Sequence, residues 1–278
     1  MPGSPKLAQK AYQNLDFLDS AEARPLRILA EFFEPLKRFR DNNVKGTIVF
    51  FGSSRILPEN QAKARLRAVK RQVAATENPA PSLWNELRQA ENLLSMSKYY
   101  TEAVKLAREI TLWSKSFSNG KRFVICSGGG PGIMEAANRG AAEAHGKSLG
   151  LNISLPKAAQ PSNRYISPGY EFEFHYFFMR KWWFIYLARA LVIFPGGYGT
   201  MDELMEVLTL CQTGKIPHKF PILLFGREYW ERVVDFDFMV EMGTISKRDA
   251  RLFRFVDSAE EALDYLKRTL PKTKEAVR

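Results

Sequence analysis

Amphipathic stretches alternate with short apolar runs along the first half of the chain. Apolar side chains recur every three or four residues from residue 21 to 40, which predicts a helix. Residues 46–51 form a β-rich run that is typical of a buried parallel strand. Helical spacing returns over residues 60–75 and 82–117, with a proline-containing break at 78–81. A first strand is therefore expected between an N-terminal helix and a helical insertion.

The second half of the chain repeats one scheme, in which an apolar run is followed by a turn and an amphipathic helix. A single helix is expected over residues 229–243, and a last one over 259–270. Such alternation predicts parallel βαβ units with helices on both faces of one sheet. The expected fold is α/β, a doubly wound, Rossmann-like parallel sheet of about six or seven strands. Besides residues 46–51, the expected strands lie at 122–127, 149–156, 171–177 (an edge strand), 190–194, 220–226 and 253–258.

The same pattern predicts the domain organisation of the 278-residue chain. Residues 1–44 are expected to form a helical extension, and residues 45–270 a single Rossmann-like nucleotide-binding domain. The helical insertion occupies about residues 57–120 of that domain, after its first strand. Residues 271–278 are expected to be a loose tail.

The composition is that of a globular protein. Apolar residues make up 45% and charged residues 26%, which excludes a disordered or collagen-like chain. Two cysteines are too few for a disulfide scaffold, and the first residues lack the apolar core of a secretory signal. The most apolar stretch, Phe177 to Gly197, is interrupted by three basic residues, so no membrane span is expected. A cytoplasmic location is the resulting expectation.

The net charge of +11 indicates a phosphate-bearing partner. Nucleic acid is one such partner, and steeply salt-dependent affinity for oligonucleotides would support it. The cations that could follow its phosphates lie on one predicted helix: Lys63, Arg65, Arg67, Lys70 and Arg71. Because no aromatic side chains are interleaved among them, a solvated helix face is the favoured interpretation. A small nucleotide substrate is therefore preferred to nucleic acid.

Two glycine turns carry the candidate chemistry. Each follows a predicted strand and begins a predicted helix, where backbone N–H groups favour anions and glycine allows close approach of a ligand. The first turn, SGGGPG, spans residues 127–132, and the second, PGGYGT, spans 195–200. Tight packing of helix on strand is the alternative reason for glycine in either turn. The candidate binding residues of the first turn are Gly129, Gly130 and Gly132.

Neither turn is of the dinucleotide or the NTPase type. The spacing is not G-x-G-x-x-G, the strand after the first turn ends without an acidic residue, and G-x-x-x-x-G-K-[ST] is absent. A mononucleotide or sugar phosphate suits two short glycine turns better. The three histidines lack metal-ligand spacing, so no metal is expected. No cofactor is expected either, because a pyridoxal phosphate enzyme needs a Schiff-base lysine on a much larger scaffold.

Two glutamates near these turns have more than one interpretation. Thr200 and Glu203 have the spacing of a capping box, in which Thr200 caps the helix and Glu203 reaches back to its N–H. A catalytic carboxylate is the other interpretation of Glu203. Glu135, three residues after Gly132, could contact the base or the ribose, or it could cap its own helix.

At these residues the chain resembles the Lonely Guy (LOG) family of cytokinin-activating phosphoribohydrolases, often misdescribed as lysine decarboxylases. The family signature P-G-G-x-G-T-x-x-E is matched from Pro195 to Glu203, and an Arg-Lys pair on the preceding helix by Arg180 and Lys181. The segment GGGPGIMEAANRGA is similar to the family's first glycine turn and helix. The resemblance is to longer bacterial members, since most plant-like members lack the N-terminal helix and the insertion.

The resemblance implies an enzyme that cleaves the N-glycosidic bond of a nucleoside 5′-monophosphate. The substrate would be a cytokinin riboside monophosphate, AMP or a similar nucleotide, and the products a free base and ribose 5-phosphate. Arg180 and Glu203 are the implied catalytic pair, and Lys181 an implied substrate-binding residue. A carboxylate stabilises an oxocarbenium-like ribose, whereas a guanidinium stays protonated and binds phosphate or the departing base. The implied phosphate cradle consists of Gly196, Gly197, Gly199 and Thr200.

Other expectations follow from the same resemblance. A homodimer is implied, with Trp182, Trp183 and Phe184 near its interface. Phe177 and Phe178 stand where plant-like members carry Met-His, and they form either a stacking wall for a purine or part of the core. The alternative function is a non-catalytic nucleotide or molybdenum-cofactor carrier on the same fold. A carrier needs only the glycines, so the Arg-Glu pair favours the enzyme.

Overall fold

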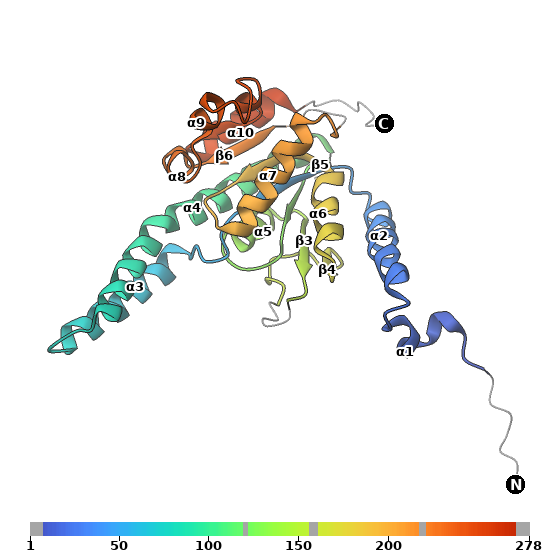
Figure 1. Cartoon of the computed structure of the whole chain (residues 1–278), viewed down its shortest axis with the longest axis horizontal. Helices are drawn as coiled ribbons and strands as arrows, with labels where there is room; N and C mark the ends of the chain where they lie inside the picture. The colour runs from blue at the N-terminus through green and yellow to red at the C-terminus, as the bar shows by residue number, and fades with distance from the viewer. Residues whose placement is uncertain (1–7, 119–121, 156–160, 217–220, 271–278) are drawn as a thin grey trace, which may run out of the picture.

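The computed structural model describes residues 8–118, 122–155, 161–216 and 221–270, and the expected tail at 271–278 lies outside them. Within these ranges seven parallel strands form one sheet in the order β4-β3-β2-β1-β5-β6-β7 (Figure 1). The inner strands β1, β2 and β6 are wholly buried and β5 is buried except at Arg189, whereas β4 alternates exposed and buried residues as an edge strand does. The predicted α/β fold is confirmed. The strands are Thr47–Phe51 (β1), Val124–Ser127 (β2), Ser148–Ile153 (β3), Glu171–Phe174 (β4), Ala188–Ile193 (β5), Ile222–Phe225 (β6) and Arg254–Val256 (β7).

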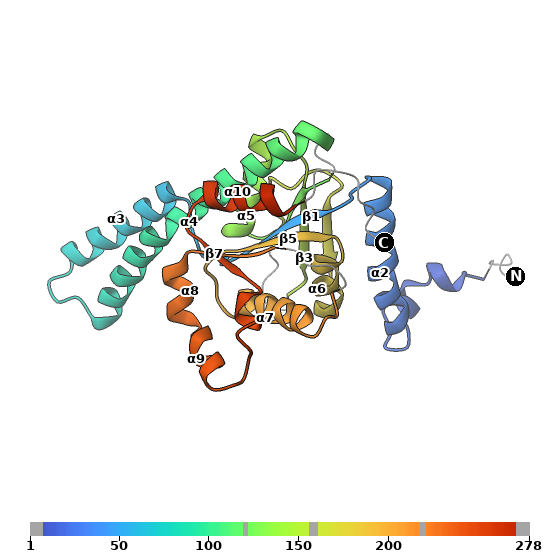
Figure 2. The ribbon, with the colours of Figure 1, turned by 90° about the horizontal axis from the view of Figure 1, so that it is seen from above.

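Helices cover both faces of the sheet (Figure 2). One face packs against α5 (Ile133–Glu143), α10 (Ala259–Thr269) and the C-terminal half of α4 (Pro81–Ser118). The other packs against α6 (Phe177–Tyr186), α7 (Tyr198–Gln212) and α8 (Arg227–Val233). Because each strand is buried under two helical layers, near-continuous apolar runs in the sequence become strands.

The single helix predicted over residues 229–243 is wrong. The structure has two helices there, α8 and α9 (Phe236–Glu241). Asp235 separates them, because its side chain accepts the backbone N–H of Phe238 at 2.8 Å and caps the second helix.

The insertion after β1 forms a helical hairpin of α3 (Glu59–Ala75) and the N-terminal half of α4, and it projects from the body of the protein (Figure 1). The five basic side chains of α3 are all exposed. Lys63 pairs with Glu59 at 2.6 Å and Lys70 with Glu91 at 3.9 Å, so part of this charge is balanced within the hairpin.

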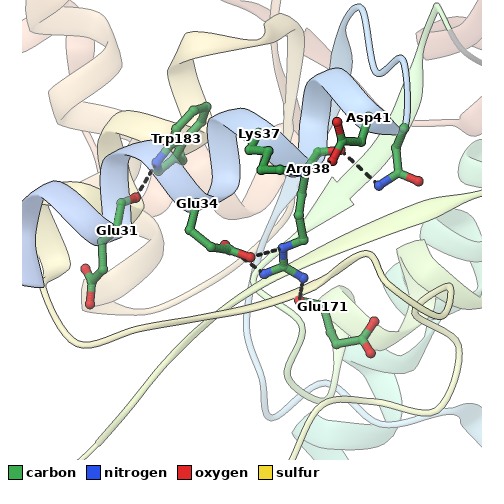
Figure 3. A network of polar contacts seen from close by, with 8 residues as sticks. Glu31, Glu34, Lys37, Arg38, Asp41, Glu171 and Trp183 are labelled. Atoms are coloured by element: carbon green, nitrogen blue, oxygen red, sulfur yellow. Dashed lines mark hydrogen bonds and ion pairs between the residues drawn. The ribbon is translucent and has the colours of Figure 1, made fainter. Parts of the chain in front are cut away.

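The N-terminal extension comprises α1 (Leu15–Leu18) and α2 (Arg24–Asp41), and α2 lies beside α6 and β4 (Figure 3). Phe39 of α2 packs against Phe172 and Trp183, with ring centroids 4.9 and 5.0 Å apart. Arg38 donates to the carbonyl of Glu171 at 2.8 Å and lies over the Phe172 ring. The helix predicted over residues 21–40 is thus docked on the domain. No helix in the described ranges is long and apolar enough to cross a membrane.

Candidate active site

Both glycine turns lie at the point where the strand order reverses. The chain adds β2, β3 and β4 on one side of β1 and then returns to place β5 on the other. The turns follow β2 and β5, the two neighbours of β1, at the same edge of the sheet. The loop after β1 contacts both, since Ser53 donates its N–H to Pro195 and accepts that of Ile133. Ligands of doubly wound sheets bind at this switch point.

Backbone conformation and close packing require glycine at several positions of the first turn. Gly129 and Gly132 have φ angles of +76° and +72°, which side chains rarely adopt. A Cβ at Gly132 would also strike the carbonyl oxygen of Ser53. A Cβ at Gly128 would lie 2.5 Å from Nη2 of Arg180. The packing interpretation therefore accounts for this turn, and Gly128 additionally makes room for the guanidinium.

A buried polar network fixes the backbone of the first turn. Ser127 donates from Oγ to Oδ1 of the fully buried Asn138 at 2.6 Å. Asn163 Nδ2 lies 3.0 Å from the Gly129 carbonyl and 3.2 Å from that of Gly130. It also contacts Asn138 Oδ1 at 3.0 Å. No sequence pattern indicated Asn163, which follows β3 in a loop and reaches the turn only through the tertiary fold.

The second turn has a different environment. At Gly196 a Cβ would meet Thr200, but at Gly197 and Gly199 no protein atom lies within 4 Å of the Cβ position. Gly197 and Gly199 are exposed, and helix α7 begins between them at Tyr198. Packing therefore explains Gly196 alone, and the other two glycines leave open space beside a helix N-terminus.

This difference gives a prediction on stability. Gly132→Ala is expected to lower the free energy of unfolding by roughly 2–4 kcal/mol, because of its positive φ and the contact with Ser53. Gly197→Ala is expected to change it by less than about 0.5 kcal/mol, since its φ of −91° suits any residue. Urea unfolding of both variants checks the prediction, and equal losses at the two positions would contradict it.

Glu203 does not belong to a capping box. Helix α7 begins at Tyr198 with Gly197 as its N-cap, so Thr200 lies inside the first turn and Glu203 in the second. Within the described residues no hydrogen bond or ion pair reaches the Glu203 carboxylate. Burial raises the pKa of Glu203 to about 7, although the neighbouring Arg180 lowers it. Glu203 is thus a largely buried carboxylate that titrates near neutral pH.

Arg180 lies between the two turns. It projects from α6, donates from Nε to the Leu151 carbonyl at 2.7 Å and lies over the Phe184 ring at 5.0 Å. Burial lowers the pKa of Arg180, and the charge of Glu203 acts in the opposite direction. Because its Nη2 is next to Gly128 and its charge acts on Glu203, the guanidinium connects the first turn to the helix of the second. The fold thus brings together the two residues expected to be catalytic.

Lys181 forms ion pairs with helix α7. Its Nζ pairs with Asp202 at 2.7 Å and with Glu206 at 3.2 Å, both on α7. Burial lowers the pKa of Lys181, but the bonds to Asp202 and Glu206 outweigh it and raise the value overall. The resemblance implies that Lys181 binds substrate. In the structure its ion pairs join α6 to α7, the two helices that carry Arg180 and Glu203.

Glu135 is held by the insertion. Tyr100 of α4 donates its hydroxyl to the Glu135 carboxylate at 2.8 Å. The N-terminus of α5 has no side-chain cap, so the capping interpretation of Glu135 is wrong. Burial and the contact with Glu135 both raise the pKa of Tyr100. The sequence did not indicate Tyr100, because its partner lies 35 residues away.

The aromatic segment of α6 is divided between core and surface. Phe177 and Phe178 are 54% and 52% exposed, so core packing is wrong for these two side chains. Trp183 and Phe184 are 2% and 1% exposed and form part of the core, so their side chains do not reach the surface. Trp182, at 36%, is exposed.

The fold and the site define a Rossmann-like α/β protein in which a carboxylate and a guanidinium lie near two glycine turns at the switch point, close enough for their charges to interact. A family model described as "Possible lysine decarboxylase" matches residues 134–266. The resemblance to the Lonely Guy family is confirmed by this match and by named relatives of that family.

Two relatives illustrate the similarity. The pyrimidine/purine nucleotide 5′-monophosphate nucleosidase of Escherichia coli (strain K12) is 31% identical over 169 residues, which are 54% of this chain and 35% of that protein. The probable cytokinin riboside 5′-monophosphate phosphoribohydrolase LOGL3 of Oryza sativa subsp. japonica is 40% identical over 85 residues, 30% of this chain and 40% of that one. The chain thus spans well under half the length of the relatives it matches.

Among solved structures, the molybdenum cofactor binding protein from Rippkaea orientalis aligns over 81% of this chain and 96% of its own, with a TM-score of 0.47 and 15% identity.

Proposed function

We propose that this protein hydrolyses the N-glycosidic bond of a nucleoside 5′-monophosphate and releases the free base and ribose 5-phosphate. One observation carries the proposal: Glu203, whose carboxylate has no hydrogen-bond or ion-pair partner among the described residues, lies close enough to the Arg180 guanidinium at the switch point for the two charges to interact. The names of the relatives, a nucleotide 5′-monophosphate nucleosidase and a phosphoribohydrolase, support the same reaction.

Each residue has a role that its environment supports. The exposed N–H groups of Gly197 and Gly199, at the N-terminus of α7, bind the 5′-phosphate together with Gly196 and Thr200. Glu203, in the next turn of that helix, stabilises positive charge on the ribose as the bond to the base breaks. The attacking water supplies a hydroxyl group to C1′, and its proton leaves with the base.

On the other side of the site, Arg180 offers a fixed positive charge to the phosphate or to the departing base. The first turn, with Gly129, Gly130 and Gly132, faces the ribose, and Glu135 contacts the ribose or the base. The exposed ring of Phe177, one helical turn before Arg180, stacks on the base.

A panel of nucleotides tests the proposed reaction. The protein is incubated with nucleoside 5′-monophosphates, a cytokinin riboside monophosphate included, and the free base is followed by chromatography. Release is expected from at least one monophosphate and from none of the matching nucleosides, because the 5′-phosphate anchors the substrate. Tight binding without release would instead favour a carrier. Glu203 disfavours a carrier. A desolvated carboxylate near a bound phosphate weakens the binding of that phosphate, and a protein that only binds has no use for it.

Two further properties belong to this proposal. Action in the cytoplasm is supported by the nucleotide substrate and by two free cysteines, Cys126 and Cys211. Assembly as a homodimer is supported by exposed aromatic side chains on adjoining helices, Trp182 and Tyr186 on α6 and Phe33 on α2.

A further inference from the structure

One residue of the N-terminal helix α2 holds α6, the helix that carries Arg180. The Glu31 carboxylate accepts the backbone N–H of His175 at 2.7 Å and that of Tyr176 at 3.3 Å. The backbone carbonyl of Glu31 accepts the indole N–H of Trp183 at 2.9 Å (Figure 3). Glu31 therefore contacts both the beginning of α6 and its second half.

The beginning of α6 lacks a cap of its own. Tyr176 occupies the N-cap position and provides no side-chain cap, unlike the Ser, Thr, Asp or Asn that helices prefer there. The Glu31 carboxylate satisfies two N–H groups at this end and places a negative charge where the helix dipole favours one. A residue about 145 positions earlier in the chain thus fixes the backbone at the N-cap of α6, where the local sequence offers no side-chain cap.

Arg180 depends on this same point of the backbone. The Tyr176 carbonyl accepts the Arg180 N–H at 3.2 Å, so Arg180 lies in the first turn of the helix that Glu31 anchors. At its other end the side chain is fixed by Leu151 and fits beside Gly128. A shift of α6 would therefore move the guanidinium relative to Glu203, and a misplacement of ~1 Å can lower turnover by about a hundredfold.

We infer that Glu31 is a positioning residue for Arg180, which makes the N-terminal extension a part of the catalytic apparatus; this rests on the proposed function. Glu31 contacts the backbone just before α6 and the Trp183 indole, and among the described residues it forms no hydrogen bond or ion pair with a group of the site itself. Its effect on turnover is therefore exerted through the placement of Arg180.

Substitution of Glu31 tests the inference in the full-length chain. Glu31→Ala is expected to lower kcat/KM by about tenfold for the best monophosphate of the panel. Glu34→Gln is the matched control, because Glu34 lies one turn further along α2 and pairs with Arg38 without contacting α6. It is expected to retain wild-type turnover. Trp183→Phe removes the second contact while keeping an aromatic ring in the core, and a loss of about threefold is expected.

A double-substitution cycle distinguishes positioning from a general loss of stability. If Glu31 acts through Arg180, Glu31→Ala costs less than about twofold in an Arg180→Lys background, because the guanidinium it places is already gone. A full tenfold loss in that background would overturn the inference, as would unchanged turnover in folded Glu31→Ala.

Amide hydrogen exchange separates this inference from the proposed reaction. Faster exchange is expected at residues 175–180 in Glu31→Ala and not in Glu34→Gln. If the wild-type protein releases no base from any nucleotide, the proposed function fails. Faster exchange in Glu31→Ala would still show that Glu31 holds the start of α6. Unchanged exchange at these residues would overturn the inference that Glu31 anchors α6, whatever the activity.

Discussion

Glu203→Gln is expected to lower turnover by about a thousandfold and to make the protein more stable above neutral pH. The amide has the size of the carboxylate but cannot stabilise positive charge on the ribose. The effect on stability follows from the pKa of Glu203, which burial raises to about 7 from an ordinary value of 4.5. A carboxyl group with a raised pKa stabilises the folded state below its unfolded pKa and loses that contribution as the pH rises through the folded pKa. The variant is therefore expected to gain about 2–3 kcal/mol at pH 8.5 and close to none at pH 4.

Denaturant unfolding at the two pH values and release of base measure these effects. Glu206→Gln, one turn further along α7, is the control and is expected to keep turnover within about threefold. In the wild-type protein, kcat/KM is expected to rise with pH through about 7 as Glu203 loses its proton. Full turnover in folded Glu203→Gln would remove the carboxylate from the mechanism.

Arg180→Ala is expected to lower kcat/KM by about a thousandfold, and Arg180→Lys by about a hundredfold. Lysine restores a positive charge but cannot both donate to the Leu151 carbonyl and lie flat beside Gly128 as the guanidinium does. Loss of the arginine also removes the charge that lowers the pKa of Glu203. The acid limb of the pH profile is therefore expected to move to higher pH in both variants. The shift is small in Arg180→Lys, which keeps a positive charge, and larger in Arg180→Ala.

The control for this prediction is Arg189→Ala. Arg189 is likewise a partly buried arginine, but it is the second residue of β5, at the end of the strand away from the glycine turns, where it contacts the Lys45 carbonyl. It is expected to retain turnover. Similar losses from Arg180→Ala and Arg189→Ala would mean that the first acts on stability and not on the reaction.

The alternation of apolar runs and amphipathic helices was sufficient to predict the sheet. Strands β1, β2, β5 and β6 are short and buried almost throughout, so their apolar runs stand out from the amphipathic helices between them. The boundary between α8 and α9 was missed because one side-chain hydrogen bond, from Phe238 to Asp235, decides it. Helix propensity averaged over a long stretch of sequence does not detect such a local contact.

The interpretation of Thr200 and Glu203 as a capping box is wrong for a related reason. Thr200 and Glu203 have its spacing, but the helix begins earlier, at Tyr198, where the exposed Gly197 allows the chain to turn. Glu203 consequently lies in the second turn of the helix, half-buried, where desolvation raises its pKa. Spacing alone leaves the start of a helix uncertain by a residue or two, and here that uncertainty separates a cap from a buried carboxylate.

By itself the sequence determined the strand and helix alternation, the two glycine turns and the residue types of the site. These are local properties, set by side-chain periodicity and by the freedom of glycine. Only the tertiary structure decided which groups meet: Arg180 with Glu203, Tyr100 with Glu135, and Glu31 with the start of α6. Such pairs join segments up to 145 residues apart, and their distances and burial arise only when the chain folds.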